Sequence, residues 1–262
     1  MSTFSVLPLP TYLIIGAQKS GTRWLIKNLR EHPEVFAAAV ELSFFNRNSR
    51  FEQGLYEYRA AFEGWNGEPV VGESTPGYMM WHGGNLDRFP ARIDESLPGV
   101  RLIASLRNPV DRAYSAFLHH MRQGRIPTDA DLLEWIRSVD PRNDKLKLIS
   151  GGWYAASLTQ YVERFGERLK ILLHDELIDN PVRFYTTVLE HIGASTGFLP
   201  ENLQEIHHRG IPPKASRYFE NGGVYRPLTI EERAELYPYF RDDLARLENL
   251  LGWNLGAWRP SL

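Results

Sequence analysis

Short apolar runs alternate along the chain with stretches whose apolar residues recur at the spacing of a helix. Four continuous runs have the pattern of strands buried on both faces, namely 12–15, 70–72, 101–106 and 169–173. Five stretches have helical spacing, namely about 21–31, 109–123, 158–165, 182–192 and 230–251. Strands that alternate with helices predict an α/β fold with three layers, in which a central parallel sheet is flanked by helices.

Nothing in this pattern divides the chain, because it contains no internal repeat, low-complexity tract or obvious linker. We therefore expect a single domain over 1–262. Two polar stretches, 138–152 and 210–227, are long for plain connections. Loops of this length in α/β domains often bind ligands or act as lids.

Composition narrows the classes of protein. Of the 262 residues, 43% are hydrophobic, which is enough for a full core, and none is cysteine. The absence of cysteine excludes disulfide scaffolds, cysteine-ligated metals and thiol catalysis, and it fits a reducing, cytoplasmic location. The net charge of −2 argues against a surface that binds nucleic acid, and no segment has the roughly 18 apolar residues of a membrane helix.

The most specific local pattern is a glycine turn between the first strand and the first helix. The turn reads Gly16-Ala17-Gln18-Lys19-Ser20-Gly21-Thr22-Arg23. In this architecture, free backbone N–H groups and a helix N-terminus face a bound anion. Residues 1–30 contain four cations and no carboxylate, so the turn lies in a local positive field. These features predict a phosphate-binding loop and, with it, a P-loop-type fold.

The turn differs from the loop of P-loop kinases and nucleotide hydrolases. Gly16 and Gly21 have the Walker A spacing, but Thr22 stands where that sequence has lysine, and the lysine lies inside the turn at Lys19. A nucleotide with a shorter phosphate chain, bound without magnesium, fits better than Mg-ATP. A kinase or hydrolase remains one alternative, and a non-catalytic nucleotide-binding module remains another.

A second candidate phosphate site follows the strand at 101–106. Arg107 ends that strand, at the edge where α/β sheets bind ligands, and Ser115 lies about two turns into the next helix. Asn108 and Pro109 predict the start of this helix. An arginine fork and a hydroxyl can together hold a terminal phosphate.

Together, the two segments resemble the sulfotransferases that use 3′-phosphoadenosine-5′-phosphosulfate (PAPS). The 5′-phosphosulfate loop of that family has a lysine inside a glycine turn, as at 18–22, and its 3′-phosphate motif has an arginine at a strand end and a serine eight residues later. Further segments are similar to the heparan-sulfate-type branch (N- and 3-O-sulfotransferases) and its bacterial relatives. These segments are 41–45 (ELSFF), 73–78 (ESTPGY), 152–165 and 250–253 (LLGW).

The resemblance implies roles for the matched residues in a PAPS-dependent sulfotransferase. The nucleotide-binding residues of the glycine turn would be Gln18, Lys19, Ser20, Gly21, Thr22 and Arg23. Lys19 would also stabilise charge on the leaving group, and Arg107 with Ser115 would hold the 3′-phosphate. Glu41 matches the general base of the heparan-type branch, and we expect partial desolvation beside two phenylalanines to raise its pKa. Glu73 is a second carboxylate that could position Lys19 or the acceptor, and His82 is a weaker rival base.

Other contacts depend on segments that match less well. Tyr154 either stacks on adenine, lines the acceptor cleft or packs in the core, and Tyr78 either lines the acceptor site or packs. Ser74 and Gly151 stand where basic residues are common in the heparan-type branch. The candidates for the basic loop near the C-terminus of the family are Lys214, Arg217 and Arg226.

The expected reaction is in-line transfer of the sulfuryl group from PAPS to a hydroxyl or amine of an acceptor, which releases adenosine 3′,5′-bisphosphate (PAP). A saccharide, a lipid and a secondary metabolite all remain open as acceptors. We expect no metal, because the histidine pairs at 119–120 and 207–208 have no acidic partner at ligand spacing. The absence of cysteine also separates the chain from the disulfide-bearing Golgi members of the family and favours a cytoplasmic, bacterial enzyme.

Overall fold

The structure, a computed structural model, describes residues 7–80, 83–84, 86–205, 218 and 226–260. Within these residues, no helix combines the length and the apolar surface that a membrane crossing requires. The chain divides into two compact units, each built from separate segments. The first consists of Met1–Met79, Asn85–Leu106 and Gln160–Ile206, and the second of Met80–Gly84, Arg107–Thr159 and His207–Leu262.

A five-stranded, fully parallel sheet forms the centre of the first unit. Its strand order is β2-β3-β1-β4-β5. The strands are β1 (Tyr12–Gly16), β2 (Val35–Ala37), β3 (Val70–Ser74), β4 (Arg101–Leu106) and β5 (Leu169–Leu173). All residues of β1 and β3 are buried, as their continuous apolar runs predict. The four predicted strands are confirmed, whereas β2, with only three residues, carries too short a pattern to be predicted.

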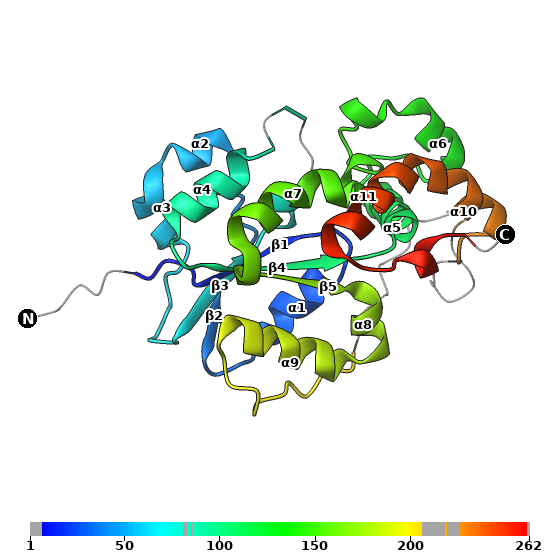
Figure 1. Cartoon of the computed structure of the whole chain (residues 1–262). Helices are drawn as coiled ribbons and strands as arrows, with labels where there is room; N and C mark the ends of the chain where they lie inside the picture. The colour runs from blue at the N-terminus through cyan, green and yellow to red at the C-terminus, as the bar shows by residue number, and fades with distance from the viewer. Residues whose placement is uncertain (1–6, 81–82, 85, 206–217, 219–225, 261–262) are drawn as a thin grey trace, which may run out of the picture. The chain divides into compact units, whose positions relative to one another are not determined.

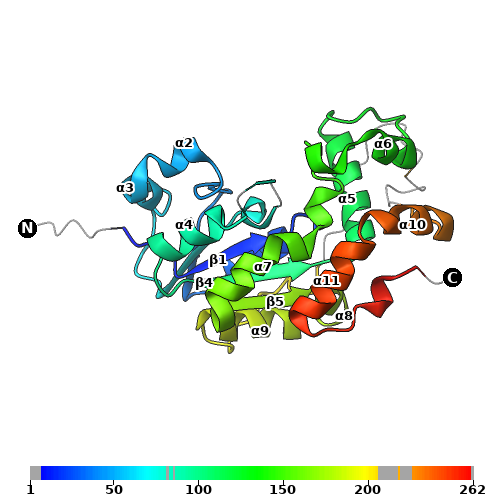
Figure 2. The same cartoon turned by 45° about the horizontal axis from the view of Figure 1, so that its top comes forward.

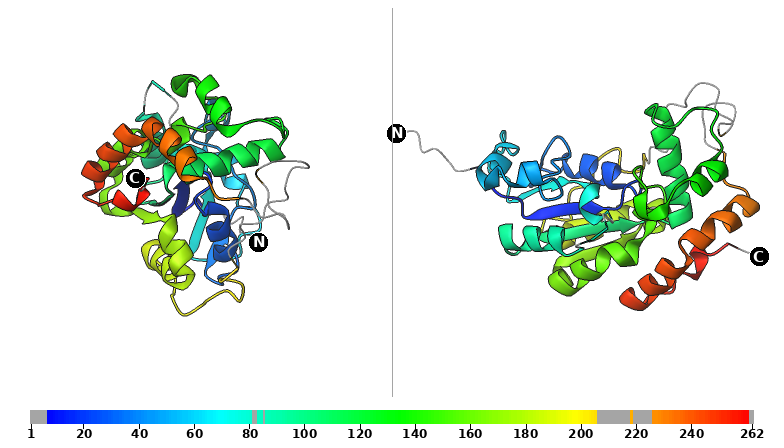
Figure 3. Two further views of the ribbon diagram at one scale, coloured as in Figure 1. Left: turned by 90° about the vertical axis from the view of Figure 1, so that its right-hand side faces the viewer. Right: turned by 90° about the horizontal axis from the view of Figure 1, so that it is seen from above.

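Helices cover the sheet on both faces (Figures 1 and 2). On one face lie α1 (Thr22–Leu29), α8 (His174–Asp179) and α9 (Pro181–Ile192). In the left view of Figure 3, the yellow-green α8 and α9 lie below the strands. On the other face lies α4 (Arg88–Ser96), and two short helices, α2 (Asn48–Phe51) and α3 (Gly54–Ala60), precede β3 in the chain. The predicted α/β fold, a parallel sheet flanked by helices, is therefore confirmed.

The second unit is mainly helical. Its helices are α5 (Pro109–Arg122), α6 (Leu132–Ser138), α10 (Ile230–Leu236) and α11 (Arg241–Leu251), and α7 (Tyr154–Phe165) runs across the boundary between the units. Asn108 caps α5 as predicted, because its side chain accepts a hydrogen bond from the N–H of Val110 at 3.0 Å. The core of this unit gathers aromatic residues around α5, among them Phe117, Tyr218 and Phe240.

Two predicted helices have different limits in the structure. The stretch 230–251 is not one helix, because Pro238 has no backbone N–H and its ring clashes with the preceding turn; a 3₁₀ turn, η5 (Tyr237–Tyr239), separates α10 from α11. The helical spacing at 158–165 covers only part of α7, which begins at Tyr154, within the segment 152–165 that resembles a family helix. Helix α7 follows the 3₁₀ turns η2 (Pro141–Asn143) and η3 (Ser150–Gly152), so the polar stretch before it is partly ordered as turns.

A close contact between β1 and β3 explains the glycine in the middle of β3. Gly72 lies directly opposite Tyr12, whose side chain is fully buried. A Cβ atom at Gly72 would lie 2.3 Å from Cε1 of the Tyr12 ring. The ring of Tyr12 therefore occupies the space that a side chain at position 72 would need. Gly72 directly precedes Glu73 in β3.

We predict that Gly72→Ala destabilises the protein by about 1–3 kcal/mol, because the added methyl group overpacks the contact with Tyr12. The measurement is the free energy of unfolding from urea denaturation. Gly197→Ala is the matched control, since a Cβ there meets its nearest atom at an ordinary 3.6 Å. Equal stability of the two variants would contradict the account of this contact.

Candidate functional site

The glycine turn has the backbone geometry of an anion-binding loop. Strand β1 ends at Gly16 and α1 begins at Thr22, with Lys19 (φ 71°) and Gly21 (φ 85°) in the left-handed region between them. A Cβ at Gly21 would lie only 2.6 Å from a methyl carbon of Leu177, so this position requires glycine. Because glycine caps α1 and its first turn has no acidic residue, the first N–H groups of the helix remain available to an anion.

Buried side-chain oxygens occur in the turn and in the strand β4 that contacts it. Gln18, Ser20 and Ser105 each have a buried side-chain oxygen that finds no hydrogen-bond partner among the residues that the structure describes. The backbone carbonyl of Ser105, in β4, accepts the N–H of Ala17 at 2.8 Å, so the two segments are in contact. Unpartnered buried polar groups are costly; the hydroxyls of Ser20 and Ser105 can donate to a bound oxyanion, whereas the amide oxygen of Gln18 can only accept a hydrogen bond. The turn therefore fits a phosphate or phosphosulfate group.

Glu41 lies in the segment between β2 and α2. Its side chain is exposed, and partial desolvation raises its pKa, while the positive charge of Arg23 opposes the shift. The direction of this shift agrees with the expectation from the sequence. Among the described residues, Glu41 forms no ion pair, so its carboxylate is not neutralised by direct contact with a cation.

Glu73, in β3, is completely buried and accepts four hydrogen bonds. Its Oε1 accepts from the hydroxyls of Tyr78 at 2.5 Å and Tyr58 at 3.2 Å, and its Oε2 accepts from the hydroxyl of Thr75 at 2.7 Å. The backbone N–H of Leu42 provides a fourth hydrogen bond. Burial raises the pKa of Glu73 to about 7, and these hydrogen bonds limit the rise because they stabilise the carboxylate.

In the second unit, Arg107 follows β4 directly in the chain. Its backbone carbonyl accepts a hydrogen bond from the hydroxyl of Tyr154 at 2.8 Å. The Tyr154 ring is buried and packs edge-on against Trp258, with 6.4 Å between the ring centroids. Tyr154 therefore packs in the core and supports the backbone of Arg107. Ser115 is half-buried on α5.

A buried arginine also orders this part of the chain. Arg112, on α5, is fully buried and donates from Nη2 to the carbonyls of Lys147, at 2.8 Å, and Leu148. Asp144 accepts hydrogen bonds from the N–H groups of Ile149, at 2.7 Å, and Ser150, at 3.0 Å. Burial lowers the pKa of Arg112, and the charge of Asp144 opposes this. The stretch before α7 is thus attached to the helix that carries Ser115.

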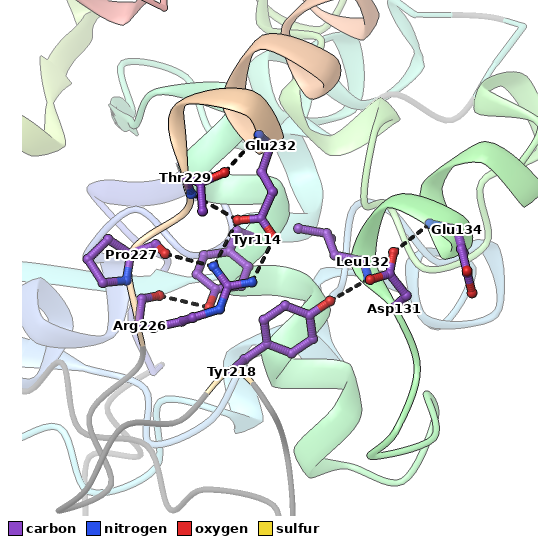
Figure 4. A network of polar contacts seen from close by, with 9 residues as sticks. All are labelled: Tyr114, Asp131, Leu132, Glu134, Tyr218, Arg226, Pro227, Thr229 and Glu232. Atoms are coloured by element: carbon purple, nitrogen blue, oxygen red, sulfur yellow. Dashed lines mark hydrogen bonds and ion pairs between the residues drawn. The ribbon is translucent and has the colours of Figure 1, made fainter.

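Arg226 is held within its own unit (Figure 4). Its guanidinium forms a bidentate pair with Glu232, at 2.7 and 2.8 Å, and lies over the ring of Tyr218, 5.0 Å from its centroid. The hydroxyl of Tyr114 donates to the Arg226 carbonyl at 2.8 Å. The other two candidate cations of this stretch, Lys214 and Arg217, lie outside the described residues, as does the rival base His82.

The sequence matches the sulfotransferase domain family over residues 9–211. The chain belongs to the sulfotransferase family. It is 31% identical over 206 residues to human heparan sulfate glucosamine 3-O-sulfotransferase 3B1, a match that covers 78% of this chain and 51% of the relative. It is 27% identical over 282 residues to the human bifunctional heparan sulfate N-deacetylase/N-sulfotransferase 3, covering 95% of this chain and 31% of the relative. The matches thus span about half or less of each of these curated relatives.

Solved structures of sulfotransferases share the fold. A sulfotransferase from Alicyclobacillus acidocaldarius is 26% identical, with a TM-score of 0.73, and the match covers 96% of this chain and 99% of that one. A mouse sulfotransferase complexed with PAP has a TM-score of 0.55 at 12% identity, covering 93% of this chain and 89% of that one. The resemblance to PAPS-dependent sulfotransferases and the predicted enzyme class are therefore confirmed at the level of the family.

The sulfotransferase sequence motifs identify only part of this constellation. The structure places Lys19, Glu41 and Glu73 in the first unit and Arg107, Ser115, Tyr154 and Arg226 in the second. No sequence motif points to the roles of Tyr58, Thr75 and Arg112, because these roles arise from contacts between distant segments. Within the part of the chain that the structure describes, no three histidine or acidic side chains are grouped so as to hold a metal ion.

The raised pKa of Glu73 predicts how stability depends on pH. The folded state binds a proton at Glu73 up to about pH 7, whereas the unfolded chain releases it near its ordinary value of 4.5. The contribution of Glu73 to the free energy of unfolding is therefore largest at acid pH and falls by about 3 kcal/mol as the pH rises from 4.5 to 7.

The test compares urea denaturation of the wild-type protein with that of Glu73→Gln between pH 4.5 and 8. Glutamine does not titrate, so the difference in stability between the two proteins should change across this range. Glu63→Gln, at an exposed position, should keep the wild-type pH dependence. Parallel curves for wild type and Glu73→Gln would contradict the assigned protonation.

Proposed function

We propose that this protein transfers the sulfuryl group of PAPS to a hydroxyl or amine of an acceptor and releases PAP. The observation that carries the proposal is the loop 16–23, in which Lys19 lies inside a carboxylate-free turn that has no side-chain cap and contains the unpartnered buried hydroxyl of Ser20. Membership of the sulfotransferase family supports the same reading. A kinase or hydrolase is less well supported, because Thr22 occupies the position of the Walker A lysine.

In the proposed reaction, an acceptor oxygen or nitrogen attacks sulfur in line with the bond to the bridging phosphate oxygen. The bond from the acceptor to sulfur forms while the bond from sulfur to that oxygen breaks, and the acceptor proton passes to Glu41. The raised pKa of Glu41 brings it closer to the working pH of a general base. Lys19 and the N–H groups at the start of α1 stabilise the negative charge that develops on the leaving oxygen.

Arg107 and Ser115 are proposed to bind the 3′-phosphate. A guanidinium fork and a hydroxyl hold a phosphate dianion by charge-assisted hydrogen bonds. Tyr154 supports this proposed contact indirectly, because its hydroxyl donates a hydrogen bond to the backbone carbonyl of Arg107. Arg226 keeps its predicted role near the nucleotide only if the phosphate competes with Glu232 for its guanidinium.

A saccharide is the leading candidate for the acceptor, because the relatives at 31% and 27% identity are named for heparan sulfate. A lipid and a secondary metabolite remain in the test as further classes. The reaction as proposed requires no metal. The cytoplasmic, bacterial setting inferred from the cysteine-free composition remains a prediction.

We predict that Lys19→Ala and Glu41→Gln each lower kcat by about 10²–10⁴-fold, because the first removes charge stabilisation and the second removes the proton acceptor. Turnover is measured with ³⁵S-labelled PAPS and a panel of acceptors comprising desulfated glucosamine oligosaccharides, a glycolipid and a phenol. Glu41→Gln should bind PAP as tightly as the wild type in calorimetry.

Lys27→Ala and Glu63→Gln are the matched controls, since both side chains are exposed. They should retain wild-type turnover. A wild-type protein that is stabilised by Mg-ATP but not by PAP would refute the sulfotransferase proposal in favour of a kinase or hydrolase. Wild-type turnover in both Lys19→Ala and Glu41→Gln would refute the assigned chemistry.

Arg107→Ala should weaken PAP binding about 10–100-fold and leave 5′-AMP binding nearly unchanged, because a charge-assisted contact to the 3′-phosphate contributes about 1.5–3 kcal/mol. Calorimetric titration with the two nucleotides measures both affinities. Arg142→Ala, on an exposed turn, is the control and should preserve the preference for PAP. Equal affinity of the wild type for PAP and 5′-AMP would contradict a 3′-phosphate site.

A further inference from the structure

The backbone amides of the three residues that follow Glu41 are connected by hydrogen bonds to the carboxylate of Glu73. The N–H of Leu42 bonds to Glu73 itself. The N–H of Ser43 donates to the hydroxyl of Thr75 at 3.1 Å, and that hydroxyl donates to Glu73 at 2.7 Å. The N–H of Phe44 donates to the hydroxyl of Tyr78 at 3.1 Å, and that hydroxyl donates to Glu73 at 2.5 Å. One direct bond and two hydroxyl relays thus fix the turn 42–44.

The direction of each hydrogen bond in these relays depends on the carboxylate. Above about pH 7, where Glu73 is ionised, its carboxylate only accepts, so both hydroxyls direct their protons to Glu73 and present their lone pairs to the backbone amides. A side chain that donates at this position would reverse one relay and leave an amide without an acceptor. Glu73 and Thr75 are almost completely buried, so water cannot easily replace a lost bond.

The turn 42–44 also contains a residue, Ser43, in an unfavourable backbone conformation. Ser43 has φ 50°, in the left-handed region, which costs a residue other than glycine about 1 kcal/mol or more. Next to it, the ring of Phe44 stacks on Tyr58 at 4.3 Å between centroids, and Phe45 packs against Tyr78 at 5.5 Å. Packing fixes the aromatic side of the turn, and the relays fix its backbone.

We propose that Glu73 is a positioning residue that acts through the hydroxyls of Thr75 and Tyr78 to fix the backbone next to Glu41, and so the place of the Glu41 carboxylate. Glu73 does not contact the substrate in this proposal. The role of Glu41 as base rests on the proposed function, but the fixing of the turn 42–44 does not. Because a general base displaced by about 1 Å can lose 10²-fold in rate, a loosened turn is expected to lower kcat.

The first test measures the turn directly by hydrogen exchange of the amides 42–44. Thr75→Val and Tyr78→Phe remove one hydroxyl each and keep the shape of the side chain. Each should lower protection at these amides at least tenfold and leave the amides of β1 and β4 unchanged. Tyr185→Phe is the matched control, because it removes a buried hydroxyl that donates to the Asn28 carbonyl, at 3.3 Å. Unchanged protection in both relay variants would overturn the proposal.

The second test separates positioning from general destabilisation. With the panel acceptor that gives the highest wild-type rate, Thr75→Val should lower kcat about 10–100-fold and leave PAP affinity unchanged, and Thr75→Ser should recover most of the rate. In a Glu41→Gln background, Thr75→Val should cause little further loss of kcat, because in this proposal the Thr75 hydroxyl affects the rate only through Glu41. An equal loss in both backgrounds would overturn the proposal.

The two tests also separate this inference from the proposed function. If the wild-type protein neither binds PAP nor transfers sulfate to any panel acceptor, the sulfotransferase proposal fails. Hydrogen exchange then still decides whether Glu73 fixes the turn: loss of protection in the relay variants supports it, and retained protection overturns it.

Discussion

The segment that carries Glu41 depends on a single buried carboxylate. Removing an ionised carboxylate from water costs several kcal/mol, whereas a hydrogen bond to a charged group returns about 1.5–3 kcal/mol. Glu73 accepts four such bonds, and its pKa nevertheless rises to about 7. Burial therefore outweighs the hydrogen bonds, although they limit the rise of the pKa. Hydroxyls from α3, from the 3₁₀ turn η1 (Pro76–Met79) and from Thr75 supply three of the four bonds around this one residue of β3.

The sequence predicts features that depend on neighbouring residues, and it does not predict contacts between segments that are far apart in the chain. Continuous apolar runs, the glycine turn and the cap at Asn108 each act within a few residues, so they predict four of the strands, the turn between β1 and α1, and the start of α5. The apolar face of 230–251 predicts one helix, whereas Pro238 divides this stretch into α10 and α11. The contacts of Tyr58 with Glu73 and of Arg112 with Lys147 could not be read, because they join segments 15 and 35 residues apart.

The two candidate phosphate sites are built by different means. The glycine turn uses backbone conformation, so glycine at position 21 and the start of α1 determine it. The segment after β4 uses side chains, since Tyr154 fixes the Arg107 carbonyl and buried Arg112 attaches the stretch before α7 to α5. The first kind of site is visible as a motif. In the second, only the proposed phosphate ligands, Arg107 and Ser115, form a motif, and the supporting residues are recognised from their burial.

Fixing a base through its backbone has a chemical consequence. If a direct ion pair held Glu41 in place, the cation would lower its pKa and weaken it as a proton acceptor. In this structure the restraint is applied to the amides of the next three residues, and Arg23 acts on Glu41 only through its charge. The carboxylate can thus be held in position while its pKa stays raised. The unfavourable burial of a carboxylate falls on Glu73, whereas Glu41 remains exposed with a raised pKa.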